Sequence, residues 1–346
     1  MLYKGDREER LGTRARAYAP DVVRIGASWQ GIQEAAYRQT SLKGWSRVKG
    51  KFYLVLAALL IGVLGVVGIV AGCGESGAST EPDSSSTAEI EGTAMERATA
   101  ILGHEPTGKA LDVINRGTMT VNNDPKYPPQ SSIDETTGEL VGFDVDVAKR
   151  VGEILGLKVE FTDLSFDTIL TDVNQDRYDV SIGSMTITPA RAKKVDFTDV
   201  YYYTPAGIVV KEGGTQITGV DDLAGKKVGV AAGTTYLQWL QENSKAKPVI
   251  YATDADAFPD LAQDNGRIDF AFTAVPTAIE AIRQGQPFEL SGDPLYYEDL
   301  AFAIKKGEAD WLALLNYSIQ TMHEDGSLTD MSKTWYVGVD LTKKAE

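Results

Sequence analysis

The chain has 346 residues, with 34 Lys and Arg against 49 Asp and Glu, which gives a formal net charge of −15. This acidic excess argues against binding to nucleic acid, which attracts basic surfaces. The charge is also unevenly distributed, because residues 1–51 carry 11 basic and 5 acidic side chains, whereas residues 73–346 carry 23 and 44. The sequence therefore divides into a basic N-terminal segment and a strongly acidic remainder.

An uncharged apolar run over residues 52–70 separates these parts and leads into Val70-Ala71-Gly72-Cys73. The run resembles a bacterial lipoprotein signal peptide with its lipobox, in which small residues admit a signal peptidase and the cysteine thiol takes up lipid. The alternative is a transmembrane anchor, because about 20 apolar residues can span a bilayer. Cys73 is the only cysteine in the chain and precedes a polar tail, which favours lipidation. Under both interpretations, the rest of the chain is exported from the cytoplasm.

Residues 1–72 are therefore predicted to be a signal peptide, and residues 73–110 a lipidated, flexible tether. Residues 74–87 of this tether are small, polar and acidic, a composition typical of linkers rather than of a core. Residues 1–47 are long for the basic region of a signal that normally has about 15–30 residues in total. We interpret the excess as an over-extension of the gene model, with a start at Val48; a genuine cytosolic extension is the alternative.

From about Leu111, short β-branched runs alternate with amphipathic stretches. Strands are predicted at residues 118–121 and 158–161, on either side of a helix over 144–155 whose apolar face carries Val147, Val151, Ile154 and Leu155. Such a unit implies parallel strands. Further strands are predicted at 178–182, 227–231, 268–272 and 300–304, and further helices at 166–173, 236–242, 276–283 and 309–324. About 235 residues of this pattern exceed one α/β core, which predicts two lobes with a ligand cleft between them.

Four stretches of the sequence are distinctive. They are residues 121–129 with 138–146, residues 178–191 with 195–198 and 201–202, residues 222–235, and residues 266–269 with the closing residues 325–328 and Trp335. In this order they resemble the amino-acid-binding periplasmic proteins of ABC importers, bacterial solute-binding protein family 3, over essentially all of residues 111–339.

The resemblance implies an α/β fold of the two-lobed periplasmic-binding-protein type, the type II clamshell, with two hinge crossovers. Residues 111–204 and 295–340 are expected to form lobe 1, and residues 205–294 lobe 2. The crossovers are expected near residues 204–206 and 291–294, where Gly and Pro interrupt the pattern.

The chemistry of the second stretch independently indicates a carboxylate-binding site. Gly183 and Ser184 expose backbone groups at a turn, while Thr186 offers a hydroxyl and Arg191 a rigid fork of donors. A guanidinium and backbone N–H groups together hold a carboxylate strongly and selectively. In the family, the equivalent residues grip the α-carboxylate of the ligand. The alternative for Arg191 is a surface position at the start of a helix.

The resemblance also assigns Tyr127 and Phe166 to aromatic positions that sandwich the ligand side chain. Core packing is the alternative for Phe166. Thr234 and Thr235 fall at a strand-to-helix turn of lobe 2, where free N–H groups favour an anion. Capping of the helix by one of these hydroxyls is the alternative.

One position departs from the family pattern. Members usually carry an aspartate five residues after the equivalent of Asp269, where it pairs with the α-amino group of the ligand, but this chain has Ala274 there, preceded by Thr273. Either another acid, such as Asp124 or Glu298, takes the ammonium, or the ligand lacks an ordinary α-amino group. The expected ligand is therefore an amino acid or a related small carboxylate.

The resemblance implies an extracytoplasmic substrate-binding lipoprotein that is anchored by lipid to the membrane and delivers its ligand to ABC permease and ATPase subunits. No cofactor, metal ion or nucleic acid is expected, because the sequence has no metal-ligand cluster, nucleophile elbow or phosphate-binding loop. Two alternatives stay open. One is an exported enzyme of the same fold, resembling cyclohexadienyl dehydratase, which uses carboxylates for acid–base chemistry. The other is a sensory ligand-binding domain.

Overall fold

The computed structural model describes residues 90–264 and 266–344. The predicted signal peptide, the lipidation site Cys73 and the first part of the predicted tether lie outside these residues. Within the described part of the chain, no helix has both the length and the apolar character needed to cross a bilayer.

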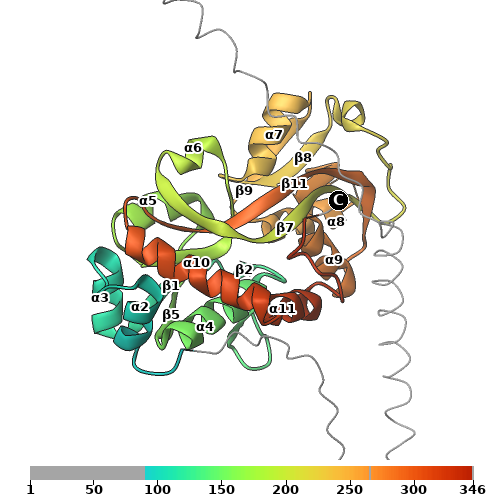
Figure 1. Cartoon of the computed structure of the whole chain (residues 1–346). Helices are drawn as coiled ribbons and strands as arrows, with labels where there is room; N and C mark the ends of the chain where they lie inside the picture. Colours follow the sequence, from blue (N-terminus) through green and yellow to red (C-terminus); the bar gives the residue numbers. More distant parts are fainter. Residues whose placement is uncertain (1–89, 265, 345–346) are drawn as a thin grey trace, which may run out of the picture.

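Two α/β lobes share one eight-stranded sheet, with the strand order β5-β1-β6-β11-β7-β10-β8-β9 (Figure 1). Its strands are β1 (Thr118–Asn122), β5 (Lys158–Thr162), β6 (Val180–Thr186), β7 (Val195–Lys211), β8 (Lys227–Ala231), β9 (Lys247–Tyr251), β10 (Phe270–Ala274) and β11 (Phe288–Lys305). A small second sheet consists of β2 (Lys126–Tyr127), β3 (Ser131–Ile133) and β4 (Leu140–Val141).

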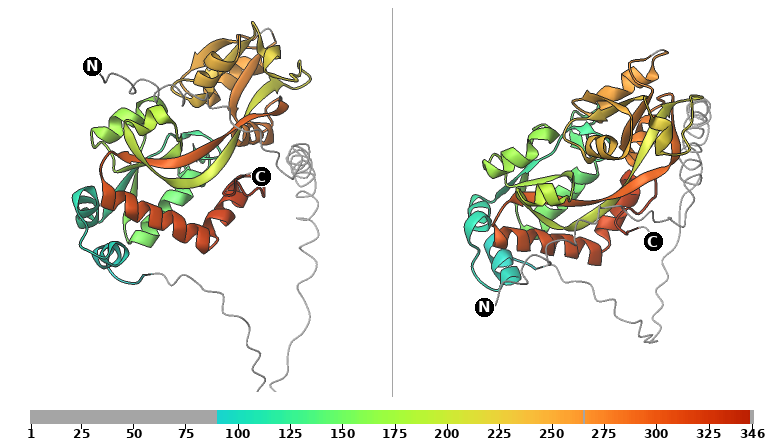
Figure 2. Two further views of the ribbon diagram at one scale, coloured as in Figure 1. Left: turned by 45° about the horizontal axis from the view of Figure 1, so that its top comes forward. Right: turned by 90° about the horizontal axis from the view of Figure 1, so that it is seen from above.

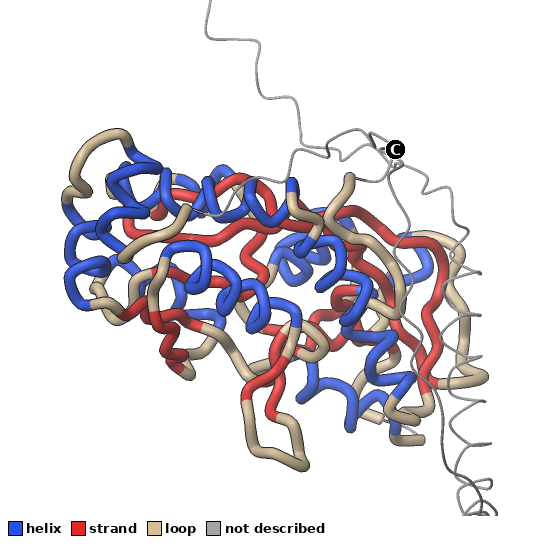
Figure 3. The backbone as a smooth tube through the Cα atoms, turned by 60° about the horizontal axis from the view of Figure 1, so that its bottom comes forward, coloured by secondary structure: helices blue, strands red, loops and turns tan. Residues whose placement is uncertain are grey.

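Helices cover the strands of both lobes (Figure 3). The first lobe carries α2 (Ala94–Leu102), α3 (Gly108–Arg116), α4 (Phe143–Leu155), η1 (Phe166–Thr168), α5 (Ile169–Asn174), α6 (Pro189–Ala192), α10 (Ala309–Glu324) and α11 (Ser327–Trp335). The second lobe carries η2 (Val220–Leu223), α7 (Thr235–Asn243), α8 (Asp254–Ala262) and α9 (Val275–Arg283).

The unit β1-α4-β5 folds as its residue pattern predicts. β1 and β5 pair in parallel, and the apolar face of α4 is packed into the core, with Val147 and Val151 0% exposed and Leu155 1% exposed. α4 ends at Gly156, whose φ of 71° is a left-handed conformation that glycine adopts without strain.

The strands β7 and β11 run through both lobes and join them (Figures 1 and 2). They pair antiparallel, with a register shift between Ser291 and Tyr296. The predicted crossovers at residues 204–206 and 291–294 lie within these two strands. The predicted two-lobed α/β architecture with two crossovers is therefore confirmed.

The core of the second lobe follows the alternation of its strands. Ile208 on β7 and Phe272 on β10 point to one face of the sheet, where they pack with α7. Their neighbours Val209 and Ala271 point to the other face, where they pack with α8 and α9. Successive side chains of a strand alternate between faces, so this part of the sheet is covered on both sides.

The structure differs from the prediction at the end of the tether. Residues 94–110 include α2 and the start of α3, and Ala98 is 1% exposed where α2 packs on the first lobe. The Arg97 Nη1 atom donates to the carbonyl oxygens of Glu153 (3.0 Å) and Ile154 (3.1 Å). Carbonyls in the last turn of a helix lack partners within the helix, so Arg97 satisfies the end of α4. Apolar packing and this cap hold residues 94–110 on the lobe.

Candidate ligand-binding site

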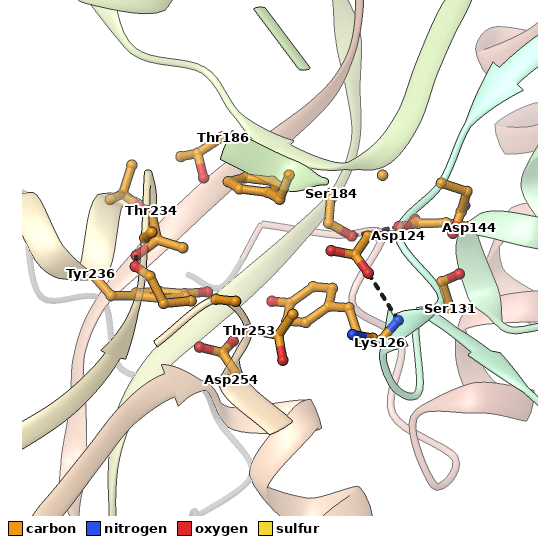
Figure 4. A pocket seen from close by; sticks show the side chains of 18 of the residues that line it. Asp124, Lys126, Ser131, Asp144, Ser184, Thr186, Thr234, Tyr236, Thr253 and Asp254 are labelled. Carbon is orange, nitrogen blue, oxygen red and sulfur yellow. Dashed lines mark hydrogen bonds between the residues drawn. The ribbon is translucent and has the colours of Figure 1, made fainter. Parts of the chain in front are cut away.

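A pocket lies between the two lobes and is lined by residues from both of them. The first lobe contributes the loop after β1, β2 and the end of β6, the second lobe contributes the turns after β8 and β9, and β11 contributes one carboxylate (Figure 4). The lining residues are Asn123, Asp124, Lys126, Tyr127, Ser131, Asp144, Phe166, Gly183, Ser184, Thr186, Ala231, Ala232, Thr234, Thr235, Tyr236, Ala252, Thr253, Asp254 and Glu298.

Most of the predicted ligand-binding residues line this pocket. They are Asp124, Tyr127, Phe166, Gly183, Ser184, Thr186, Thr234 and Thr235. Arg191 and Thr273 are buried against lining residues instead. The Arg191 guanidinium lies 5.7 Å from the centre of the Phe166 ring, and the Thr273 hydroxyl donates to Asp254. The structure brings these residues together, and their contact with a ligand stays a prediction.

Arg191 links the two lobes. Its Nη1 atom donates to the carbonyl oxygen of Thr186 in the first lobe (2.9 Å), and its Nη2 atom donates to that of Gly233 in the second (3.0 Å). The side chain is buried, so the alternative of a surface position is wrong. Burial lowers the pKa of the guanidinium, and the nearby carboxylate of Glu298 offsets part of this effect.

Glu298 lies where the lobes meet. β11 places its Oε1 atom within hydrogen-bond distance of the Thr186 hydroxyl of the first lobe (2.9 Å) and of the Thr235 hydroxyl of the second. Burial raises the pKa of Glu298, while hydrogen bonds from hydroxyl groups lower it. Glu298 thus engages two of the hydroxyls that the sequence assigns to the ligand carboxylate.

The backbone of β6 at Ser184 is held by a buried carboxylate. Ser184 has a φ of 56°, which is uncommon for a residue with a side chain. Its hydroxyl donates to the Oδ2 atom of Asp144 (2.7 Å), whose Oδ1 atom accepts from the Tyr201 hydroxyl (2.6 Å). Burial raises the pKa of Asp144 to about 7. These buried bonds fix Ser184 in the conformation that places it at the pocket.

Two lining residues, Thr234 and Asp124, accept hydrogen bonds from backbone N–H groups nearby in the chain. Thr234 is the N-cap of α7, because its hydroxyl accepts from the backbone N–H of Leu237 (3.3 Å). The capping alternative is therefore confirmed for Thr234. The Oδ1 atom of Asp124 accepts from the backbone N–H of Lys126 (3.0 Å; Figure 4), and burial raises the pKa of Asp124.

Asp254 is a pocket residue that the sequence analysis missed. It begins α8, directly after β9, and neither element was predicted. Thr253 caps this helix through a capping box with Asp256. The Thr-x-x-Asp spacing after the β-branched run of β9 was the available signal. Asp254 is 6% exposed, and burial raises its pKa to about 7.

The sequence has clear relatives among known proteins. The model of the bacterial extracellular solute-binding proteins, family 3, matches residues 119–338. The L-cystine-binding protein TcyJ of Escherichia coli (strain K12) is 34% identical over 235 residues, which cover 67% of this chain and 86% of that protein. The ABC transporter arginine-binding protein 1 of the same strain is 32% identical, over 66% of this chain and 92% of that protein. This chain belongs to family 3 of the bacterial extracellular solute-binding proteins.

Solved structures agree with this assignment. An ancestral arginine-binding protein bound to arginine gives a TM-score of 0.60 at 35% identity, over 64% of this chain and 98% of that chain. The ancestral amino acid-binding protein AncCDT-1, a precursor of cyclohexadienyl dehydratase, gives 0.61 at 34% identity, over 65% and 98%. The neighbours are type II periplasmic binding proteins, so the predicted fold class is confirmed.

Family membership places the solute-binding domain outside the cytoplasm. It also makes the interlobe pocket the candidate solute site, because this pocket draws residues from both lobes and from a crossover strand. Among the described residues, no group of three or more His, Cys, Asp and Glu side chains is arranged to hold a metal ion.

Proposed function

We propose that this protein captures an amino acid between its two lobes and delivers it to the permease and ATPase subunits of an ABC importer. The observation that supports this most directly is the interlobe pocket, where hydroxyl groups and carboxylates from both lobes and from β11 converge. Relatives are named as binding proteins for L-cystine, arginine and glutamine.

The charges around the pocket favour a ligand that carries an ammonium or guanidinium group beside its carboxylate. Asp124, Asp254 and Glu298 line the pocket, while positive charge comes from Lys126 and from Arg191 behind the lining. A zwitterionic or cationic amino acid presents its positive groups to these acids and its carboxylate to the hydroxyls and the guanidinium. Such complementarity is expected to select amino acids over anionic solutes.

A ligand panel tests the proposal. L-Arginine, L-lysine, L-cystine and L-glutamine are compared with glycine betaine and with carboxylates that lack an amine, by thermal shift and calorimetry. A ligand at about a hundredfold its Kd stabilises the folded protein by roughly 2.7 kcal/mol. For a domain of this size, that shifts the melting temperature by about 5–10 °C. If none of the amino acids binds at millimolar concentration, the proposal is wrong.

We further propose that Cys73 carries lipid and holds the binding domain at the membrane, beside its transporter. The support is the lipobox-like sequence Val70-Ala71-Gly72-Cys73, which lies outside the described residues. Residues 74–87, which follow Cys73, have the small, polar and acidic composition that is typical of linkers.

Binding rather than catalysis is our proposal for the pocket. The named relatives are binding proteins. The enzyme alternative has one observation in its favour, because Asp144 and Asp254 have pKa values of about 7, raised by burial, and such acids can donate protons at neutral pH. Incubation with prephenate-like cyclic acids separates the two functions. Turnover of such an acid would identify an enzyme, whereas saturable binding without product agrees with transport.

The sensory alternative differs from transport in its partners rather than in its pocket. A permease and an ATPase encoded beside this protein would favour transport. Ligand-dependent stimulation of ATP hydrolysis by the reconstituted permease and ATPase is the direct measurement, and an absence of stimulation would favour sensing.

A further inference from the structure

Asp254 has a buried carboxylate oxygen that makes no hydrogen bond of ordinary geometry in the described structure, although the backbone N–H of Ala231 lies near the carboxyl and lowers its pKa. Its side chain lines the interlobe pocket and is 6% exposed (Figure 4). The Oδ2 atom accepts a hydrogen bond of 2.7 Å from the Thr273 hydroxyl. The Oδ1 atom is buried and has no hydrogen-bond partner among the described residues. Such a group is costly to bury, which points to a donor that arrives with the ligand.

The sheet topology explains why Asp254 and Thr273 meet at the pocket. β9 and β10 both pair in parallel with β8, which lies between them. The carboxyl ends of all three strands therefore reach the same edge of the sheet. Asp254 follows β9, and Thr273 is the second-last residue of β10, directly before the buried Ala274. The hydroxyl of one strand thus orients the carboxylate that follows the other.

In Glu298 and Asp124, a carboxylate oxygen already accepts hydrogen bonds from neighbouring groups. Glu298 Oε1 accepts from the hydroxyls of Thr186 and Thr235, and Asp124 Oδ1 accepts from the backbone N–H of Lys126. Among the described residues, Asp254 is the acid with a buried oxygen that lacks any partner. A cationic N–H group is the donor that best matches this oxygen, because hydrogen bonds between ions are shorter and stronger than neutral ones.

The electrostatic environment agrees with a cationic donor. Burial raises the pKa of Asp254 to about 7, the Thr273 hydroxyl and the backbone N–H of Ala231 oppose this, and the negative charges of Glu298 and Asp124 raise it further. Tyr127 and Tyr236 are the titratable groups beside it, and burial and the charge of Asp254 raise the pKa of Tyr127. A cation in the pocket would relieve the repulsion among these carboxylates.

We propose that Asp254, oriented by Thr273, is the residue that binds the α-ammonium group of the ligand. This proposal rests on the proposed function, since it requires an amino acid in the interlobe pocket. Asp254 contacts the ligand directly, through Oδ1. Thr273 is a positioning residue, because it acts through the Oδ2 atom of Asp254.

The test pairs a protein variant with a ligand variant. L-Arginine is compared with 5-guanidinopentanoate, which lacks its one α-ammonium group, and L-cystine with 3,3′-dithiodipropionate, which lacks both of its α-ammonium groups. Asp254→Asn should weaken binding of the amino acid about 10- to 100-fold, the range for a hydrogen bond to a charged group. It should change binding of the amine-free partner less than about threefold. Equal losses for both ligands, or no loss for the amino acid, would overturn the proposal.

Matched variants separate a local effect from misfolding. Asp221→Asn removes the same charge from an exposed position of the second lobe outside the pocket lining and should leave affinity unchanged. Thr273→Val should weaken amino-acid binding, whereas Thr273→Ser keeps the hydroxyl and should restore it. An effect of Asp221→Asn as large as that of Asp254→Asn would instead assign the loss to the overall charge of the second lobe, and would overturn the proposal.

Proton release gives a second readout. A cation beside Asp254 lowers the pKa of this carboxyl in the complex, so binding of a protonated amine near pH 7 should release protons. Calorimetry in buffers of different ionisation enthalpy measures this release in wild type, and Asp254→Asn should remove it. If wild-type protein binds none of the amino acids, the proposed function fails. If wild type binds and Asp254→Asn retains both affinity and proton release, the assignment of Asp254 alone fails.

Discussion

At the scale of single residues, Arg191 both connects the two lobes and lies at the wall of the pocket. Its guanidinium bonds to backbone carbonyls of both lobes, through Thr186 and Gly233. It also lies over Phe166 at the pocket wall. A guanidinium has five donors in a rigid fork, so these two bonds leave donors for a ligand carboxylate.

Arg191→Lys is expected to weaken ligand binding by about 1.5–3 kcal/mol, because lysine keeps the charge but loses the fork. Isothermal titration calorimetry with the tightest ligand of the panel measures the change. Lys193→Ala, which alters an exposed cation two residues away, is the control and should leave affinity unchanged. An unchanged affinity in Arg191→Lys would confine Arg191 to a structural role.

The buried acids predict an unusual pH dependence of stability. Burial raises the pKa of Asp144 and Asp254 from 3.8 to about 7. Between these values the folded state binds more protons than the unfolded state, so the free energy of unfolding falls as the pH rises. The protein without added ligand should therefore melt at a higher temperature at pH 5 than at pH 7.5.

Melting curves at intervals from pH 5 to pH 8 test this dependence. One unit of pKa shift corresponds to about 1.4 kcal/mol, and each kcal/mol moves the melting temperature of such a domain by about 2–4 °C. Asp254→Asn should flatten the profile, while Asp221→Asn, at an exposed position outside the pocket, should keep its slope. A profile that rises towards pH 7.5 in wild type would contradict this assignment of buried, protonated acids.

At the scale of secondary-structure elements, α2 shows how a short helix becomes part of a lobe. Its N-terminus is closed by a capping box between Thr93 and Glu96, which satisfies backbone N–H groups locally. Its packing comes from Ala98, which is buried against the first lobe. Isolated helices of this length are marginal in water, so tertiary contacts supply most of its stability.

Arg97→Ala is expected to lower the free energy of unfolding by about 1–2 kcal/mol, because the carbonyl of Ile154 loses the Arg97 donor and that of Glu153 keeps only the backbone N–H of Gly156. Urea denaturation followed by circular dichroism measures the loss. Ligand affinity should not change, since α2 contributes no residue to the pocket lining. A loss of affinity with unchanged stability would reverse this assignment and connect α2 to the site.

At the scale of the whole molecule, the lobes are joined by two paired strands rather than by flexible linkers. β7 and β11 continue from one lobe into the other, and contacts of Arg191 and Glu298 bridge the lobes at the pocket. In a hinge of this kind, a few residues change their backbone angles while each lobe moves as a rigid body. The register shift near Ser291 is the place in β11 where such motion is expected.

The lipid anchor is a prediction about the mature molecule. Intact-mass analysis of membrane-extracted protein should show residues 73–346 with added acyl groups, and Cys73→Ala should lose the diacylglycerol because its thiol is absent. Membrane fractionation of the same variant is the companion measurement. Mature protein that still contains residues 1–72 would instead identify a transmembrane anchor.

The sequence by itself determined the elements whose pattern is local. The apolar face of α4 and the β-branched residues of β8 predicted those elements within one residue of their observed bounds. Periodicity reports burial of one face, so it works where a helix or strand has one clear apolar face. It missed β9 and α8, since β9 is short, begins at Lys247-Pro248 and is only partly buried, and α8 contains Pro259.

Only the tertiary structure decided how the pocket is charged. Asp254, Thr273 and Glu298 lie in three separate elements, and their meeting depends on the order of strands in the sheet and on the two crossovers. The sequence showed that Ala274 left an ammonium without its expected partner, but it offered Asp124 and Glu298 as substitutes. Hydrogen bonding between residues distant in the chain depends on how the lobes pack. In the packed structure, a buried oxygen of Asp254 has no hydrogen-bond partner among the described residues.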